Sequence, residues 1–129
     1  MIRWYLDTSA AAKLLLAEDG STALIDEINH VQPELVASLL LETELRRMTR
    51  RIPELTQEMV SSVLAKVSLY TIEPAQFTHA GLLPGAHLRS LDALHLATAI
   101  DLQAQAMVTY DLRLGSAARD SGLSVIAPA

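Results

Sequence analysis

Short apolar runs alternate with longer amphipathic segments along the whole chain. Four of the runs have the length and the aliphatic or β-branched content of strands, and a fifth apolar stretch, Leu35–Ala37, follows Pro33. The four predicted strands are Ile2–Leu6, Ser68–Ile72, Ala106–Tyr110 and Leu123–Ile126. Strands that alternate with helices indicate parallel crossover connections. The pattern therefore predicts an α/β fold, a three-layer α/β/α sandwich with a parallel central sheet.

The segments between these runs repeat their apolar residues at helical spacing. Ser21 is expected to cap the second helix, Pro53 to interrupt the third, and Pro74 to open a later one. The predicted helices are Thr8–Ala17, Ser21–Val31, Ser38–Arg51, Glu54–Val67, a helix from Pro74 to about Pro84, Ser90–Ala104 and Asp111–Ser121. Because no repeat, low-complexity tract or linker divides the chain, residues 1–129 are expected to form one domain.

Two aspartates stand directly after predicted strands. Asp7 follows the first strand, and Asp111 follows the strand Ala106–Tyr110. Ligands of parallel sheets bind beyond the carboxyl ends of the strands, so both carboxylates are expected near a binding edge. An aspartate before a helix is also a favoured N-cap, and either residue taken alone is more simply explained as a cap.

Glu44 is expected to face inward from its helix. On a helical wheel it projects within the apolar arc, whereas Glu42 lies on the opposite face, four residues before Arg46, and is expected to form an exposed pair with it. The apolar arc consists of Ala37, Leu40, Leu41, Leu45 and Met48. Because a lone buried carboxylate is costly, Glu44 needs a partner, either a buried arginine or a divalent cation.

Asp92 lies in the first turn of the helix Ser90–Ala104, which is apolar on all sides. The helix dipole alone could favour an acid there. His95 follows one turn later on the same side, either as a satisfied core histidine, the simpler interpretation, or as a residue that orients a ligand. Four carboxylates at one edge would repel one another, and a shared cation explains them better than four separate structural reasons.

Composition limits the chemistry that this chain can perform. The chain has no cysteine, which excludes disulfides and thiolate metal sites and fits a reducing cytoplasm. No segment approaches the length of a membrane span, so no membrane contact is expected. The formal net charge is −5, so any contact with nucleic acid must come from a local basic patch. The candidate ligands are all oxygens, which suits Mg²⁺ or Mn²⁺.

Four segments together resemble the PIN-domain ribonucleases, most closely the VapC-type toxins of prokaryotic toxin–antitoxin pairs. They are Tyr-Leu-Asp-Thr-Ser at 5–9, residues 37–47, Leu-Arg-Ser-Leu-Asp-Ala-Leu-His-Leu-Ala-Thr-Ala at 88–99, and residues 108–114. The resemblance implies a parallel sheet with the first strand central and hydrolysis of RNA to a 5′-phosphate and a 3′-hydroxyl. The family's acidic positions match Asp7, Glu44, Asp92 and Asp111, and its nearby hydroxyls match Thr8, Ser9 and Thr109.

The resemblance also gives these residues provisional roles. Asp7, Asp92 and Asp111 are expected to coordinate the metal, and Glu44 to bind it directly or to hold its water. A cluster of arginines at one helix end is hypothesised to guide RNA phosphates, although a solvated face explains each one more simply. The cluster consists of Arg46, Arg47, Arg50 and Arg51.

Relatives of this kind form homodimers and are silenced by a cognate antitoxin, so an RNA substrate, an antitoxin and a second copy are the expected partners. The alternative is a catalytically silent PIN scaffold that acts through protein–protein contacts.

Overall fold

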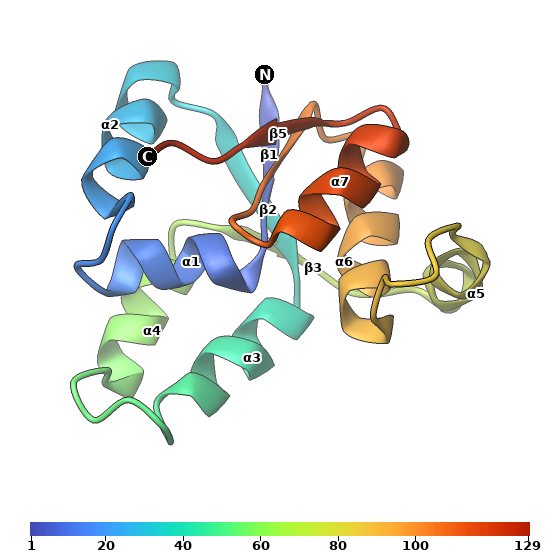
Figure 1. Cartoon of the computed structure of the whole chain (residues 1–129). Helices are drawn as coiled ribbons and strands as arrows, with labels where there is room; N and C mark the ends of the chain where they lie inside the picture. Colours follow the sequence, from blue (N-terminus) through green and yellow to red (C-terminus); the bar gives the residue numbers. More distant parts are fainter.

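A five-stranded parallel sheet forms the centre of the computed structural model, which describes residues 1–129 (Figure 1). Its strand order is β3-β2-β1-β4-β5, so the first strand is central. The strands are β1 (Arg3–Leu6), β2 (Glu34–Ser38), β3 (Ser68–Tyr70), β4 (Ala106–Val108) and β5 (Ser124–Ile126). All four neighbouring pairs are parallel, which confirms the predicted α/β class.

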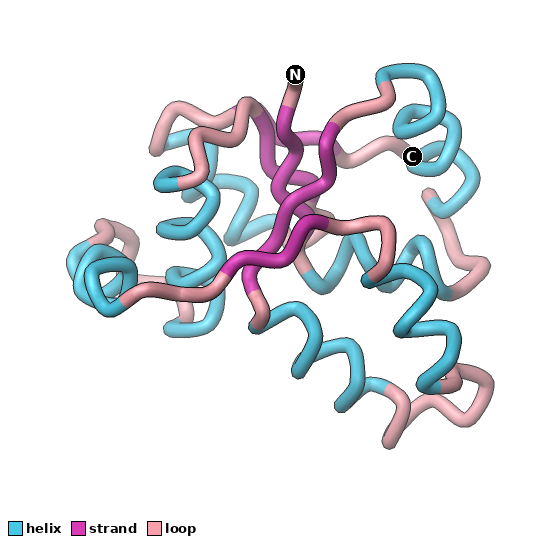
Figure 2. The backbone as a smooth tube through the Cα atoms, turned by 180° about the vertical axis from the view of Figure 1, so that it is seen from behind, coloured by secondary structure: helices cyan, strands magenta, loops and turns pink.

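Helices cover both faces of this sheet, as Figures 1 and 2 show. Helices α1 to α4 pack on one another on one face, and α5, α6 and α7 lie together on the other. The helices are α1 (Thr8–Leu15), α2 (Ser21–Val31), α3 (Leu40–Met48), α4 (Gln57–Leu64), α5 (Pro74–Leu82), α6 (Ser90–Asp101) and α7 (Leu112–Asp120). The three-layer arrangement was therefore predicted correctly.

Because helices cover both faces of the sheet, the strands are apolar along their length and do not alternate between apolar and polar residues. In β1, Tyr5 and Leu6 are completely buried although they point to opposite sides of the sheet. Leu6 lies opposite Val108 of β4 in the parallel register. The residues that follow these two strands, Asp7 and Thr109, are thus held next to each other at the carboxyl edge by a rigid, buried pair of strands.

The predicted capping role of Ser21 is wrong. Gly20 is the N-cap of α2, with a left-handed φ of 88°, and no side chain caps this helix. The Ser21 hydroxyl instead donates to the Leu16 carbonyl (2.7 Å) and accepts from the Glu18 amide (3.0 Å). The serine therefore stabilises the turn between α1 and α2, because the carbonyl at the end of α1 needs a donor.

Most predicted helices are shorter than expected, and two of them begin two or three residues late. The helix predicted from Ser38 begins at Leu40, because Ala37 and Ser38 pair with β3 and belong to β2. The helix predicted over residues 54–67 is α4, which starts after Thr56, whose hydroxyl accepts from the Met59 amide. In both places strand pairing or a capping side chain determines the boundary, which apolar periodicity does not detect.

The helices are all short relative to a bilayer. None is both long enough and apolar enough to cross a membrane.

Candidate active site

Asp7 is the most deeply buried of the candidate carboxylates, at 4% exposure. It caps α1 as predicted: Oδ1 accepts hydrogen bonds from the Ala10 amide (2.9 Å) and the Ser9 hydroxyl (2.7 Å). Oδ2 accepts from the Thr109 hydroxyl at 2.5 Å. Burial raises the pKa of Asp7, and these three hydrogen bonds and the nearby His95 only partly offset that effect.

Glu44 projects from α3 toward the same edge and is partly buried. Its Oε1 accepts a hydrogen bond from the Thr8 hydroxyl (2.7 Å) and lies 2.6 Å from His95 Nε2. The expected need for a partner is met by this histidine, and no arginine pairs with Glu44. Burial alone would raise the pKa of Glu44, but the hydrogen bond and charge of His95, with the bond from Thr8, lower it.

His95 lies in a buried hydrogen-bonded chain and is 1% exposed. A carboxylate only accepts hydrogen bonds, so Nε2 carries the proton shared with Glu44. Nδ1 lies 2.7 Å from the Tyr5 hydroxyl, which also accepts from the Ser38 amide at 3.3 Å. Both ring nitrogens are therefore satisfied, and the chain from Ser38 through Tyr5 and His95 fixes the position of Glu44.

Tyr5 is a member of this chain that the sequence did not suggest. Its position two residues before Asp7 on a strand, and hence on the same side, is the signal that could have indicated it. Burial raises the pKa of the Tyr5 hydroxyl, and the negative charges of Glu44 and Asp7 add to this effect, while its bond with Ser38 opposes it. The hydroxyl therefore serves as a neutral hydrogen-bonding group.

Asp92 and Asp111 line one cavity of about 330 Å³ at the carboxyl edge. Asp111 caps α7, as predicted, with Oδ1 accepting from the amides of Arg113 (2.9 Å) and Leu114 (3.0 Å). Asp92 makes no side-chain hydrogen bond. The interaction between Asp92 and His95, one turn apart on α6, is electrostatic alone, because both ring nitrogens of His95 are directed at Tyr5 and Glu44.

Three of the carboxylates, Glu44, Asp92 and Asp111, interact electrostatically. Together with Asp7, whose charge acts with that of Glu44 on Tyr5, they are called the acidic cluster. Burial raises the pKa of Asp92, and the negative charges of Asp111 and Glu44 raise it further. His95 and Arg89 oppose these effects without cancelling them. Groups that destabilise one another in this way indicate a site for a positive ligand.

The fit of a divalent cation to these residues is partial. No three of the histidine, aspartate and glutamate side chains stand in an arrangement that would by itself hold a metal ion. Mg²⁺, however, commonly takes one or two carboxylates and completes its shell with water and substrate phosphate. Asp92 accepts no hydrogen bond and Asp7 Oδ2 accepts one, so both retain free lone pairs. The donor set thus fits a partly hydrated ion rather than a closed protein cage.

The arginines at the end of α3 are of two kinds. Arg46 forms the predicted pair with Glu42 (2.8 Å) and also donates to Gln57 (2.9 Å) and Ser61 (3.1 Å) of α4. Its guanidinium is therefore engaged in joining two helices. Arg47, Arg50 and Arg51 are exposed to solvent and lie one to two turns beyond Glu44.

Two other arginines lie much closer to the acidic residues and were not among the predicted contacts. Arg89 and Arg113 line the cavity that contains Asp92 and Asp111. Arg89 precedes Asp92 by three residues and Arg113 follows Asp111 by two, and this spacing is the signal that could have pointed to them.

Comparison with known proteins identifies the family. The family model of the PIN domain matches residues 4–120. Ribonuclease VapC35 of Mycobacterium tuberculosis is 40% identical over 129 residues, and ribonuclease VapC46 of the same species is 36% identical over 126 residues. In both comparisons the match covers 96% of this chain and 96% of the relative.

Solved structures agree in fold. The crystal structure of M. tuberculosis VapC20, a sarcin–ricin loop cleaving toxin, superimposes with a TM-score of 0.74 at 16% identity, covering 97% of this chain and 99% of that one. VapBC2 of Rickettsia felis, bound to a DNA fragment from its promoter, superimposes with a TM-score of 0.73 at 14% identity. The match covers 97% of this chain and 98% of that one. The resemblance in sequence, the matched fold and the full-length relatives agree: this chain belongs to the PIN-domain family and, within it, to the VapC ribonucleases.

Proposed function

We propose that this chain is a divalent-metal-dependent endoribonuclease and the toxin of a type II toxin–antitoxin pair. The observation that carries the proposal is the acidic cluster at the carboxyl edge of the sheet, where Asp92 and Asp111 line one cavity and His95, on the same helix as Asp92, holds Glu44. Such a cluster destabilises the fold when no cation is bound, and perturbed carboxyl groups of this kind gather at functional sites. The full-length identity to VapC ribonucleases supports RNA as the substrate class.

In this proposal Asp7, Asp92 and Asp111 hold Mg²⁺ or Mn²⁺. A bound ion of this kind lowers the pKa of a coordinated water and stabilises the charge on the leaving oxygen. Ser9 and Thr109 hold the Asp7 carboxylate in one orientation through their hydroxyls. Glu44, fixed between Thr8 and His95, is placed to orient the attacking water or to complete the coordination.

The experiment is cleavage of a panel of RNAs by the purified chain in Mg²⁺, Mn²⁺ or EDTA. Wild type is expected to cleave with either metal and to be inactive in EDTA. Replacing Asp92 or Asp7 with Asn should lower the rate by at least about 100-fold, because an amide removes the charge that the cation requires. The matched control is Glu42→Gln, which alters an exposed carboxylate on the same helix as Glu44 and should leave the rate unchanged. Equal cleavage by all the variants would refute the proposal.

The expected partners belong to the same proposal. Structural neighbours include a toxin–antitoxin complex from Klebsiella pneumoniae at 16% identity, and an antitoxin and a second copy of this chain are the proposed partners. The alternative is a catalytically silent scaffold, which would neither bind Mn²⁺ nor cut RNA. The presence of all four acidic residues of the family in this chain does not favour that alternative.

A further inference from the structure

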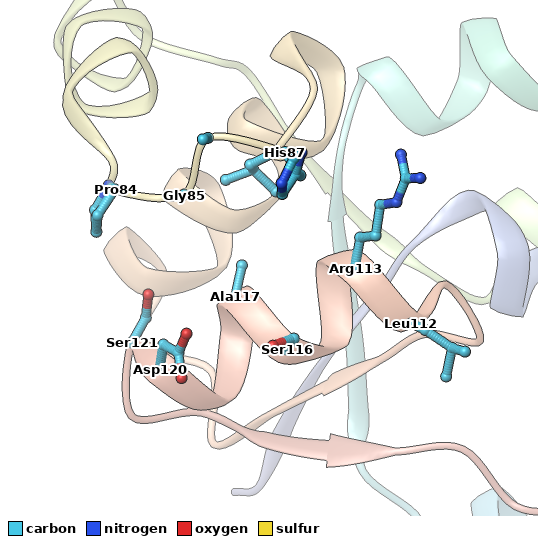
Figure 3. A pocket seen from close by; sticks show the side chains of 11 residues that line it. Pro84, Gly85, His87, Leu112, Arg113, Ser116, Ala117, Asp120 and Ser121 are labelled. Carbon is cyan, nitrogen blue, oxygen red and sulfur yellow. The ribbon is translucent and has the colours of Figure 1, made fainter.

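A groove beside the acidic cluster carries positive charge that the proposed chemistry does not use. The cavity with Asp92 and Asp111 shares Leu112 and Arg113 with a second cavity of about 380 Å³. This second cavity lies between the loop that precedes α6 and one side of α7 (Figure 3). The two cavities therefore adjoin at Leu112 and Arg113, and together we call them the groove.

The cations of this groove lie at the end next to the acidic residues. Arg89 and Arg113 both line the first cavity, and Arg113 also lines the second. In Figure 3 the Arg113 guanidinium and the His87 ring project from opposite walls, α7 and the loop, while Asp120 lies at the far end of the groove. The order along the groove is thus the acidic cluster, the arginines, a polar and apolar trough, and the Asp120 carboxylate at the far end.

Neither arginine has a structural role that would explain its position. Arg3 and Arg46 make ion pairs and hydrogen bonds within the fold, whereas the structure gives none for the guanidinium of Arg89 or Arg113. Both side chains are exposed. Arg89 nevertheless lies close to Asp92, since both side chains line the same cavity. Two unpaired guanidinium groups are thus held within reach of the site without contributing to packing.

A substrate polyanion must overcome repulsion from four carboxylates in a chain of net charge −5. Guanidinium groups bind phosphate oxygens in two parallel hydrogen bonds, so a pair of them at the edge of the cluster offsets this repulsion where the RNA enters. Leu88, Leu112 and Ala117 give the trough apolar walls against which a ribose or base can pack. Each cavity is at the small end of the size range of ligand sites, which suits one nucleotide at a time.

We propose that Arg89 and Arg113 form a phosphate-binding subsite for single-stranded RNA, and that the groove beyond them holds the nucleotide next to the scissile bond. This inference rests on the proposed function for its substrate class. It differs from the hypothesis for Arg46, Arg47, Arg50 and Arg51, which lie on the opposite layer of the molecule.

The test separates binding from cleavage. Binding of a short fluorescent single-stranded RNA is measured in EDTA, over about 50 to 300 mM salt, for wild type, the double variant Arg89→Gln/Arg113→Gln, and Arg119→Gln. Arg119 is the matched control because it is an exposed arginine on α7 that does not line the groove. The double variant should bind about tenfold more weakly, since two charge-assisted contacts are lost. The slope of the logarithm of its binding constant against the logarithm of salt concentration should become shallower by about 0.7 for each phosphate contact removed.

Thermal melting checks that the double variant is folded, and its midpoint should lie within about 3 °C of that of wild type, because neither guanidinium makes a hydrogen bond or ion pair in the fold. Equal RNA binding by the double variant and wild type, or an equal loss in Arg119→Gln, would overturn the subsite. So would a result in which the double variant keeps RNA binding but loses affinity for a polyglutamate peptide, since the arginines would then serve a protein partner.

Failure of the proposed function gives a different result. If wild type binds RNA through the two arginines but does not cut it in Mg²⁺ or Mn²⁺, the subsite stands and the nuclease assignment fails. If wild type cuts RNA while the double variant binds as tightly as wild type, the nuclease assignment stands and the subsite fails.

Discussion

At the scale of single residues, two carboxylates of the acidic cluster lower the stability of the fold when they are ionised. Asp7 and Asp92 both have pKa values raised by burial, which means that their ionised forms are less stable in the folded chain than in the unfolded chain. Glu44 is the exception, because the hydrogen bonds from His95 and Thr8 stabilise its carboxylate. The protein therefore stabilises the charged form of Glu44, whereas burial destabilises the charged forms of Asp7 and Asp92.

The destabilisation of the fold by the ionised Asp92 carboxylate should be measurable as a dependence of the melting temperature on pH. A carboxyl whose pKa is raised on folding contributes stability that is complete below its ordinary value of 3.8 and is lost as the pH rises through the folded value. In the absence of metal, Asp92→Asn should therefore raise the melting temperature at pH 7 by roughly 1 to 3 °C. The gain should disappear as the pH falls below about 4.

Glu42→Gln is the control for that measurement, because it removes an exposed charge that is already paired. It should not raise the melting temperature at any pH. A lower melting temperature for Asp92→Asn at neutral pH would contradict this account of the cluster.

The buried hydroxyl of Tyr5 gives a second prediction at this scale. Tyr5→Phe leaves the Ser38 amide and His95 Nδ1 without partners, so it should cost about 1 to 3 kcal/mol of stability. If the chain through His95 positions Glu44, the turnover rate on RNA should fall about tenfold with KM nearly unchanged.

Tyr70→Phe is the matched control for that substitution, since the Tyr70 hydroxyl has no hydrogen bond in the fold. Turnover by Tyr5→Phe equal to that of Tyr70→Phe would remove Tyr5 and His95 from any positioning role.

The sequence predicted individual residues well where a local rule applied. Asp7 and Asp111 cap helices as the N-cap rule predicts, and Glu42 pairs with Arg46 as helical spacing predicts. The partner of Glu44 could not be found in this way, because His95 lies 51 positions further along the chain and only the fold brings them together. For the same reason the helical wheel wrongly included Ala37, which is a strand residue.

At the scale of elements, periodicity predicted the order of the helices and of four strands but not their ends. It detected β2 only as a short apolar stretch, Leu35–Ala37. The central place of β1 in the sheet was implied by the resemblance in sequence, since alternation alone leaves several parallel orders possible. The turn before α2 shows the limit most clearly: Ser21 is a good cap by residue type, but the carbonyl of Leu16 competes for its hydroxyl.

The junction of α3 with α4 yields a prediction about which arginine is structural. Arg46→Gln removes the ion pair with Glu42 and the bonds to Gln57 and Ser61, and should cost about 0.5 to 1 kcal/mol in denaturant unfolding. Arg50→Gln should change stability by less than about 0.5 kcal/mol, because that side chain is exposed. Equal effects of the two substitutions would show that Arg46 does not join the helices.

At the scale of the whole molecule, an acidic chain is proposed to bind a polyanion. The arrangement of charge makes this possible: the carboxylates are gathered at one edge of the sheet, and unpaired arginines stand beside them in the groove. The carboxyl ends of β1 and β4, the start of α6 and the middle of α3 all meet at that edge. Their convergence on a cation is the claim on which the proposed chemistry depends.

Titration with Mn²⁺, in which free Mn²⁺ is followed by electron paramagnetic resonance, tests that claim most directly because it needs neither RNA nor turnover. Wild type and Glu42→Gln should bind Mn²⁺ saturably and with equal affinity. Asp92→Asn and Asp111→Asn should each bind it at least about tenfold more weakly. No saturable binding by wild type, or the same affinity in all four proteins, would contradict a shared cation at this edge.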